Sequence, residues 1–338
     1  MFLIKKSDKT KTAMSKKTIS LVMALIFISV IVGIGCVQPL HKKKFIISGT
    51  YLEVSSPDRR AAKIVYKEFK RLDNIFNIYN RKSELYRLNR TYSKPFKAST
   101  ELIELLQLSE NIYDLSEGTF DITYGSLYKF WKELIREGKP KKFPTPEVIA
   151  KIKEAGGMEQ IEINPKKATV TIKKKGLTID LNGVAKGYMV DKAISRLKEK
   201  GIKSALINAG GDIYCLGMNA GSPWEVGIQN SDAVSEILGV RLLIDEAIAT
   251  SGGYEQFFTF DHKEYSHLVD PRSGYPVDND LISVSVISKN CTTADSLATV
   301  FSILGLEGIK KFLSKNPSTM RVFLVRSVGE DKQIHIFE

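Results

Sequence analysis

The chain has 338 residues, 43% of them hydrophobic, and carries 50 basic against 38 acidic side chains, for a net charge of +12. This composition can bury a full core, so it excludes a disordered chain and fits one large domain or two smaller ones. Six lysines and Asp8 give the first 35 residues a charge of +5, which leaves +7 for the rest. There the lysines are mixed with acidic residues, as on solvated helix faces, which argues against a nucleic-acid partner.

The N-terminal segment has the order of a targeting sequence. Lysines up to Lys17 precede an apolar run over residues 19–35, and Cys36 follows. This order resembles a bacterial lipoprotein signal, in which the cysteine is acylated, although Gly33 stands where a leucine-like residue is expected. The alternative is an uncleaved anchor, because a run of about 17 residues is near the lower limit for spanning a bilayer.

Either interpretation of the N-terminus predicts the same organisation. We expect a signal peptide or membrane anchor over residues 1–35, a basic tether over 36–44 and one domain over 45–338. The domain should be exported and held at the outer, periplasmic face of the cytoplasmic (inner) membrane, since the lysines before the apolar run stay inside.

Within the domain, hydrophobic periodicity predicts the elements in chain order. A strand is expected over residues 45–54, and helices over 57–79, 99–116 and from 145 to the glycines at 156 and 157. Strands are expected over 168–172, 177–181, 204–208, 224–229, 240–244 and 282–287, with helices over 185–200 and 293–304. This mixture of hairpin-like strands and inserted helices predicts an α+β fold with largely antiparallel sheets.

Two cysteines, Cys215 and Cys291, remain in the domain. Neither has a zinc-type spacing, so cysteine metal ligation is not expected. They could form a disulfide, but two small buried hydrophobic side chains are the favoured interpretation.

Three glycine-containing loops follow predicted strands. They cover residues 180–188, 208–212 and 249–254, and the first joins a buried strand to a helix start with Lys186 nearby. Such a turn suits a phosphate, because glycine admits a ligand to the backbone and free helix amides attract anions. The same glycines are also expected in turns with a purely steric role.

Asp295 and Thr299 stand four residues apart on a predicted helix, so their oxygens share one face. One carboxylate and one hydroxyl suffice for a Mg²⁺ ion that also binds substrate phosphates. The alternative is a threonine bonded back to its own helix beside a surface aspartate. His267, in a polar loop with Asp270, is a candidate general base, although a lone histidine can also be structural.

Taken in order, these motifs resemble the ApbE-type FAD:protein FMN transferases. The match includes residues 48–50, 79, 83–89, 118–123, 180–188, 208–212, 249–254, 267–274 and 294–299. It spans nearly the whole domain, and it implies a single ApbE-like (T-fold-like) α+β domain.

The resemblance also implies a set of site residues. FAD, the substrate, would be bound by Ser48, Tyr79, Thr119, Phe120, Asp121, Asp180, Asn182, Lys186, Tyr188 and Val269. Mg²⁺ would be held by the carbonyl of Ala185 with Asp295 and Thr299. Family members often carry methionine at position 48 and a second glycine at position 182, so this chain departs from the pattern there.

The implied reaction is transfer of FMN from FAD to a threonine of a target protein through a phosphoester, with release of AMP. His267 would deprotonate the threonine, and Asp270 would orient it or act as a second candidate base. Targets would be flavin-carrying subunits of membrane ion-pumping or electron-transfer complexes. The alternatives are an exported Mg-dependent FAD pyrophosphatase, a non-catalytic flavin-binding lipoprotein, or a basic lipoprotein that only binds the envelope or a partner.

Overall fold

The computed structural model describes residues 39–138, 140, 142–229, 237–252, 257–329 and 331–338. The chain divides into two compact units, Met1–Pro39 and Leu40–Glu338, and every described element belongs to the second. Cys36 and the predicted signal or anchor lie outside the described residues. None of the described helices is long and apolar enough to cross a membrane.

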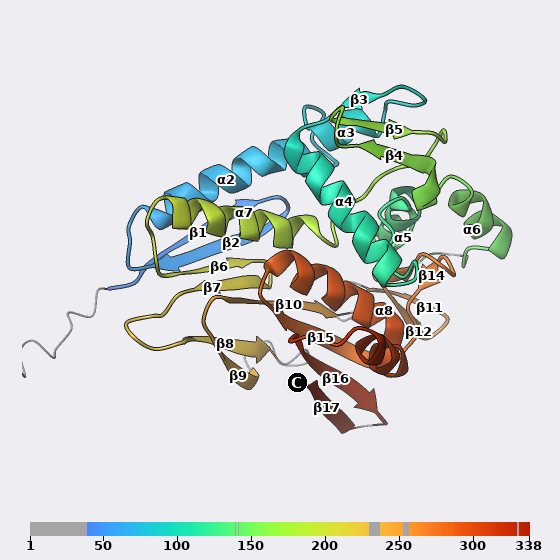
Figure 1. Ribbon diagram of the computed structural model, residues 1–338. Helices are drawn as coiled ribbons and strands as arrows, with labels where there is room; N and C mark the ends of the chain where they lie inside the picture. Colours follow the sequence, from blue (N-terminus) through green and yellow to red (C-terminus); the bar gives the residue numbers. More distant parts are fainter. Residues whose placement is uncertain (1–38, 139, 141, 230–236, 253–256, 330) are drawn as a thin grey trace, which may run out of the picture. The chain divides into compact units, whose positions relative to one another are not determined.

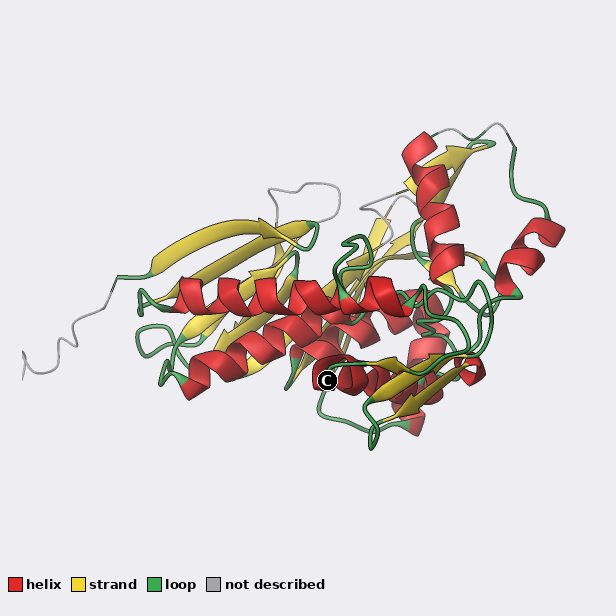
Figure 2. Cartoon of the chain, turned by 90° about the horizontal axis from the view of Figure 1, so that it is seen from above, coloured by secondary structure: helices red, strands yellow, loops and turns green. Residues whose placement is uncertain are grey.

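An eight-stranded antiparallel sheet forms the centre of the second unit, in the order β1-β2-β6-β7-β10-β15-β16-β17. Its strands are β1 (His41–Ile47), β2 (Thr50–Ser56), β6 (Ala205–Ala209), β7 (Asp212–Leu216), β10 (Glu246–Gly252), β15 (Leu281–Ser288), β16 (Arg321–Val328) and β17 (Asp331–Phe337). Figures 1 and 2 show helices layered over one face of this sheet. They are α2 (Ala61–Phe76), α7 (Ala185–Glu199) and α8 (Cys291–Lys315), and the main core lies between them and the strands.

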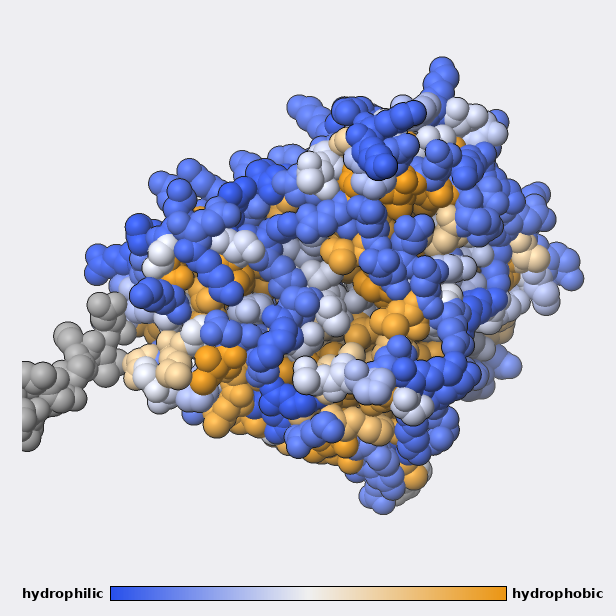
Figure 3. All heavy atoms as spheres, in the orientation of Figure 1, coloured by the Kyte–Doolittle hydropathy of each residue, from blue (hydrophilic) through white to orange (hydrophobic). Residues whose placement is uncertain are grey.

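The opposite face of the sheet packs against a hairpin of β8 (Trp224–Gln229) and β9 (Ile237–Leu243). Trp224, Val226 and Leu243 of this hairpin form a second apolar cluster with residues of the sheet such as Ile287 and Phe323. Cys215 belongs to this cluster and Cys291 to the main core; both are buried and free, as expected for small apolar side chains. On the face shown in Figure 3, hydrophilic side chains cover much of the surface, with apolar patches between them.

The remaining elements lie beyond these layers. α3 (Glu84–Leu88) and α4 (Thr100–Leu115) accompany a small sheet of β3 (Phe96–Lys97), β5 (Thr169–Ile172) and β4 (Ile161–Asn164), with a 3₁₀ turn, η1 (Met158–Gln160), before β4. A third apolar cluster joins α5 (Gly125–Glu137) and α6 (Pro146–Lys153) to β11 (Phe257–Phe260), β12 (Lys263–Ser266), β13 (Val269–Asp270) and β14 (Tyr275–Pro276). Trp131 lies at its centre, fully buried, and stacks on Phe258 with ring centroids 6.0 Å apart.

The α+β class with antiparallel sheets is confirmed. Ser99 caps α4 as predicted, since its hydroxyl accepts a hydrogen bond from the Leu102 amide at 3.3 Å. Several boundaries differ. The strand predicted over residues 45–54 is the hairpin β1–β2, because Ser48 and Gly49 both adopt positive φ and turn the chain.

Two further corrections concern segments near the ends of elements. Residues 41–44, predicted as tether, belong to β1, where Lys44 pairs with Glu53 across the hairpin at 2.8 Å. Residues 177–181 form no strand; the Ile179 amide donates to the Asn89 side chain and the Asp180 amide to the Ile122 carbonyl, both at 2.8 Å. These bonds replace a strand partner and hold the segment extended.

Candidate active site

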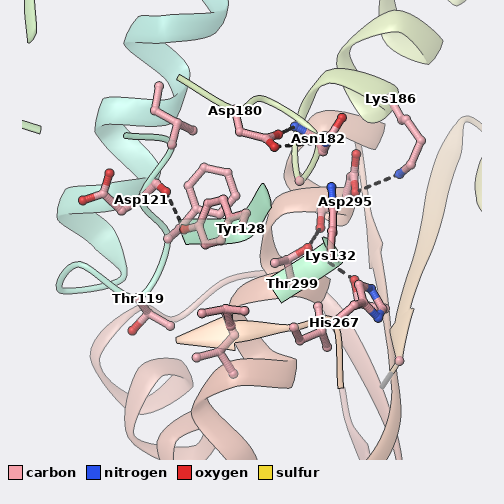
Figure 4. A pocket seen from close by; sticks show the side chains of 18 of the residues that line it. Thr119, Asp121, Tyr128, Lys132, Asp180, Asn182, Lys186, His267, Asp295 and Thr299 are labelled. Carbon is pink, nitrogen blue, oxygen red and sulfur yellow. Dashed lines mark hydrogen bonds and ion pairs between the residues drawn. The ribbon is translucent and has the colours of Figure 1, made fainter. Parts of the chain in front are cut away.

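A cavity of about 220 Å³ lies where α5, α7, α8, β10 and the loop after β12 meet (Figure 4). It is lined by Thr119, Phe120, Asp121, Ile122, Tyr128, Lys132, Asp180, Asn182, Gly183, Lys186, Gly210, Thr250, Ser251, Gly252, His267, Leu268, Val269, Asp295, Thr299 and Ile303. The lining includes ten predicted site residues, which lie in four segments of the chain, 119–121, 180–186, 267–269 and 295–299. All three predicted glycine-containing segments contribute to it, but Thr250, Ser251 and Gly252 belong to strand β10 and not to a loop as predicted.

The loop before α7 is held by its own side chains. The carboxylate of Asp180 accepts hydrogen bonds from the amide N–H of Asn182 at 2.8 Å and from its side-chain amide at 3.2 Å. This arrangement closes the turn from which α7 starts. Through these two hydrogen bonds the Asp180 carboxylate holds the loop in place next to the cavity.

A buried charge cluster lies at the start of α7. The ammonium of Lys186 pairs with Asp212 and lies 3.4 Å from the nearer carboxylate oxygen of Asp295. Asp212 and Asp295 are only 2% and 4% exposed. Two carboxylates face one lysine, so the cluster has one negative charge in excess when both carboxylates are ionised, and a cation nearby would favour that ionised state.

The pKa values in this cluster follow from burial and charge. Burial and the neighbouring Asp295 carboxylate raise the pKa of Asp212, while Lys186 opposes them. Burial alone would lower the pKa of Lys186, but Asp212 and Asp295 together raise it above its ordinary value. Asp212 is the first residue of β7, and the turn of Gly210 and Gly211, both with positive φ, brings it here.

The first turn of α7 packs closely on α8. The Gly187 amide donates to Asp295 at 3.0 Å, and a Cβ at Gly187 would overlap the Cys291 carbonyl and lie 2.9 Å from the Asp295 Cβ. Asp191, one turn later, accepts hydrogen bonds from the Cys291 amide at 2.7 Å and the Thr292 amide at 2.8 Å. One glycine and one carboxylate therefore fix the two helices against each other.

The predicted metal ligands lie at this contact. Asp295 and Thr299 both line the cavity, whereas Ala185, the first residue of α7, is buried beside it. The Thr299 hydroxyl lies 3.3 Å from both the Asp295 carbonyl and the Ser251 hydroxyl, so it is bonded back to its helix. Asp295 is nevertheless buried and not a surface residue. A carboxylate, a hydroxyl and a carbonyl are oxygen donors of the kind that Mg²⁺ prefers.

The described residues contain no cluster of three or more His, Cys, Asp or Glu side chains arranged to hold a metal. The predicted ligand set has one carboxylate, one hydroxyl and one carbonyl, which is the sparse set that Mg²⁺ uses when substrate phosphates complete its coordination.

The segment of residues 119–121 forms another wall. Thr119 Oγ1 is buried and has no hydrogen-bond partner among the described residues. Asp121 accepts hydrogen bonds from the Thr123 amide at 2.8 Å and hydroxyl at 2.6 Å, yet burial raises its pKa. An unpaired buried hydroxyl costs free energy, so Thr119 is suited to receive a polar atom of a ligand.

The third wall comes from α5, a helix that the sequence patterns did not predict. Tyr128 and Lys132 stand four residues apart on it and both line the cavity. The Tyr128 hydroxyl donates to the Asp121 carbonyl at 2.6 Å, and burial raises its pKa. Helix-spaced apolar residues at 127, 131 and 134 were the available signal.

Only one residue of the predicted catalytic pair, His267 and Asp270, lines the cavity. His267 lines the cavity from the loop after β12, and Val269, 4% exposed, follows it. Asp270 does not line the cavity; its carboxylate accepts from the Arg272 backbone amide at 2.9 Å and from the guanidinium at 2.8 Å. Asp270 thus stabilises its own turn, and its role as a group acting beside His267 stays a prediction.

Three predicted FAD-binding residues also do not line the cavity. The Ser48 hydroxyl donates to Asp73 at 2.8 Å, and Tyr79 is 72% exposed. Tyr188 is 2% exposed, and its hydroxyl donates to Glu104 at 2.7 Å. In this structure the side chains of these residues are engaged or exposed elsewhere, so the predicted set is brought together only in part.

Fold and cavity together define an α+β protein with a polar cavity built from α5, α7, α8, the central strand β10 and the loops beside them. The comparisons identify its family. The family model described as "ApbE family" matches residues 48–324. The chain therefore belongs to the ApbE family, and the resemblance predicted from the sequence is confirmed.

Individual relatives agree. The "FAD:protein FMN transferase" of Vibrio cholerae is 33% identical over 288 residues, which cover 81% of this chain and 84% of the relative. The "FAD:protein FMN transferase" of Haemophilus influenzae is 27% identical over 289 residues, which cover 83% of this chain and 82% of the relative. The structure of "Flavin Transferase ApbE from Vibrio cholerae" matches with a TM-score of 0.77 and 28% identity, covering 88% of this chain and 97% of that one. The Thermotoga maritima ApbE protein matches with a TM-score of 0.77 and 25% identity, covering 88% and 96%.

Proposed function

We propose that this protein is a Mg²⁺-dependent FAD:protein FMN transferase. It moves FMN from FAD to a threonine hydroxyl of a target protein, forms a phosphoester and releases AMP. The family membership and the names of the relatives support the transferase activity. The observation that carries the metal dependence is the buried cluster of Lys186, Asp212 and Asp295, in which two carboxylates face one lysine and Lys186 and Asp295 line the cavity.

In this reaction the target hydroxyl attacks the phosphorus on the FMN side of the FAD diphosphate. The bond to the bridging oxygen breaks, a threonine phosphoester forms, and AMP leaves with that oxygen. His267, which lines the cavity, accepts the hydroxyl proton on an imidazole nitrogen. Positioning contributes much of the rate, because little other covalent chemistry is required.

The residues at the α7–α8 contact would hold the metal. Asp295, Thr299 and the Ala185 carbonyl supply hard oxygen donors, and Lys186 limits the charge of the two carboxylates. When bound, Mg²⁺ supplies neutralisation of the charge that gathers on the diphosphate oxygens. The buried Thr119 hydroxyl and the Asn182 loop then bind the polar parts of FAD.

The N-terminal sequence supports an exported location. The apolar run over residues 19–35 followed by Cys36 suits lipid anchoring on the outer, periplasmic face of the cytoplasmic (inner) membrane. Targets there would be threonine-containing, flavin-carrying subunits of ion-pumping or electron-transfer complexes.

The test is incubation of the purified protein with FAD, Mg²⁺ and a threonine-containing target peptide, followed by intact mass. A gain of FMN minus water on the peptide, lost in Asp295→Ala, would support transfer at this site. The control is Glu307→Ala, which removes an exposed carboxylate from the same helix α8. Free FMN and AMP with an unmodified peptide would support the pyrophosphatase, and unchanged bound FAD the flavin carrier.

A further inference from the structure

Lys132 is a cation in the cavity that the proposed mechanism does not use. It lines the cavity from α5 (Figure 4), and among the described residues it makes no hydrogen bond or ion pair. The other lysine of the lining, Lys186, is paired with Asp212 and Asp295. Of the two lysines in this lining, Lys132 is therefore the one whose charge can pair with a bound ligand.

The neighbouring residues fix which way Lys132 points. Trp131, the preceding residue, is fully buried, and its indole N–H donates to the Gly274 carbonyl at 2.9 Å. Tyr128, one turn earlier on the same face as Lys132, donates to the Asp121 carbonyl at 2.6 Å. These two bonds prevent α5 from rotating, so the face that carries Lys132 is directed at the cavity.

The acids of the lining do not provide a partner for Lys132. Asp180 is engaged with Asn182, Asp121 with Thr123, and Asp295 with Gly187 and Lys186. An ammonium ion beside a cavity with an unpaired buried hydroxyl at Thr119 is suited to a ligand that is anionic and rich in acceptor oxygens.

We propose that Lys132 binds the diphosphate of FAD. This rests on the proposed function, in which FAD is the substrate. At neutral pH the diphosphate carries the negative charge of FAD, whereas the flavin and adenine rings are neutral. A lysine contacts phosphate as a point charge, so Lys132 acts from the α5 wall while the proposed metal residues act from the α7–α8 wall.

The experiment measures equilibrium binding of FAD, ADP and riboflavin to the full chain at fixed Mg²⁺ and salt. The variants are Lys132→Met, which keeps the side-chain length, and Lys132→Arg, which keeps the charge. Lys129→Met is the matched control, because Lys129 lies on the same helix, is 73% exposed and pairs only with Glu133 at 3.7 Å. ADP contains the diphosphate and adenosine but no flavin, whereas riboflavin contains the flavin ring and the ribityl chain but no phosphate.

We expect Lys132→Met to weaken both FAD and ADP about tenfold, as for loss of one charge-assisted contact, while riboflavin binding stays unchanged. Lys132→Arg should restore most of the affinity, and Lys129→Met should match the wild type. Unchanged FAD and ADP affinities in Lys132→Met would overturn the assignment. If these affinities stayed unchanged while the KM for the target rose, Lys132 would contact the target and not the diphosphate. Equal loss of riboflavin would overturn it too, by showing a collapsed cavity.

The outcome is separable from the proposed function. If the wild type bound FAD and ADP with the expected dependence on Lys132 but transferred nothing, the diphosphate assignment would stand and the transferase proposal would fail. If transfer occurred and Lys132→Met bound ADP normally, the reverse would hold.

Discussion

Replacing Lys186 with methionine removes the cation between two buried carboxylates. Asp212 and Asp295 would then face each other at 2% and 4% exposure with no counter-charge from the lysine. Breaking a buried ion pair typically costs 3–5 kcal/mol, and the one-third exposure of the Lys186 side chain reduces this. We expect Lys186→Met to lower the free energy of unfolding by about 2–4 kcal/mol at pH 8 in the absence of Mg²⁺.

The loss should depend on pH. Lys186 lowers the pKa of Asp212, which burial and Asp295 raise, so without the lysine the folded pKa of Asp212 should lie further above the unfolded value of about 4. A folded state that binds the extra proton is most stable at low pH and loses stability as pH rises through the raised pKa. The defect of Lys186→Met should therefore be smaller at pH 5 than at pH 8.

Urea unfolding at the two pH values measures this, with Lys200→Met, an exposed lysine just after α7, as the control. The control should stay within about 0.5 kcal/mol of the wild type. If Lys186→Met were as stable as Lys200→Met at both pH values, the two buried carboxylates would not need the charge of Lys186. The argument for a cation at this cluster would then fail.

Two further changes test the same region and the proposed base. Gly187→Ala should push α7 away from α8, because its Cβ overlaps the Cys291 carbonyl; we expect about 1–3 kcal/mol of destabilisation by calorimetry and weaker Mg²⁺ binding by titration. Equal stability to the wild type would mean that the helices adjust freely. His267→Ala should lower the transfer rate far more than FAD affinity, as single-turnover kinetics and binding would report; a loss confined to FAD affinity would remove His267 from the base role.

The sequence predicted the parts of the fold whose signal is local. α4 was found because a serine cap precedes a helix-spaced stripe, and α7 because the apolar positions repeat along it. α8 was found only in its first part, since Gly305 with φ 69 interrupts a helix that continues to Lys315. β1 and β2 were predicted as one strand because the turn signal of Ser48 and Gly49 lies inside a continuous run of strand-forming residues.

The sequence predicted those parts of the site whose residues lie close together in the chain. The loops holding Asp180 and His267, and the pair Asp295 and Thr299, do line one cavity. The contributions of Tyr128 and Lys132 were missed because they depend on how α5 packs. The grouping of Asp212 with Lys186 depends on strand order, which no local pattern encodes.

The carboxylate of Asp191 has a wider effect. By accepting hydrogen bonds from the first amides of α8, it sets the axial position of that helix against α7 using protein atoms alone. The oxygens proposed for the metal are thus preorganised before any ligand arrives, and little conformational entropy is left to lose when one binds. Such a protein can keep its cavity formed while no ligand is bound.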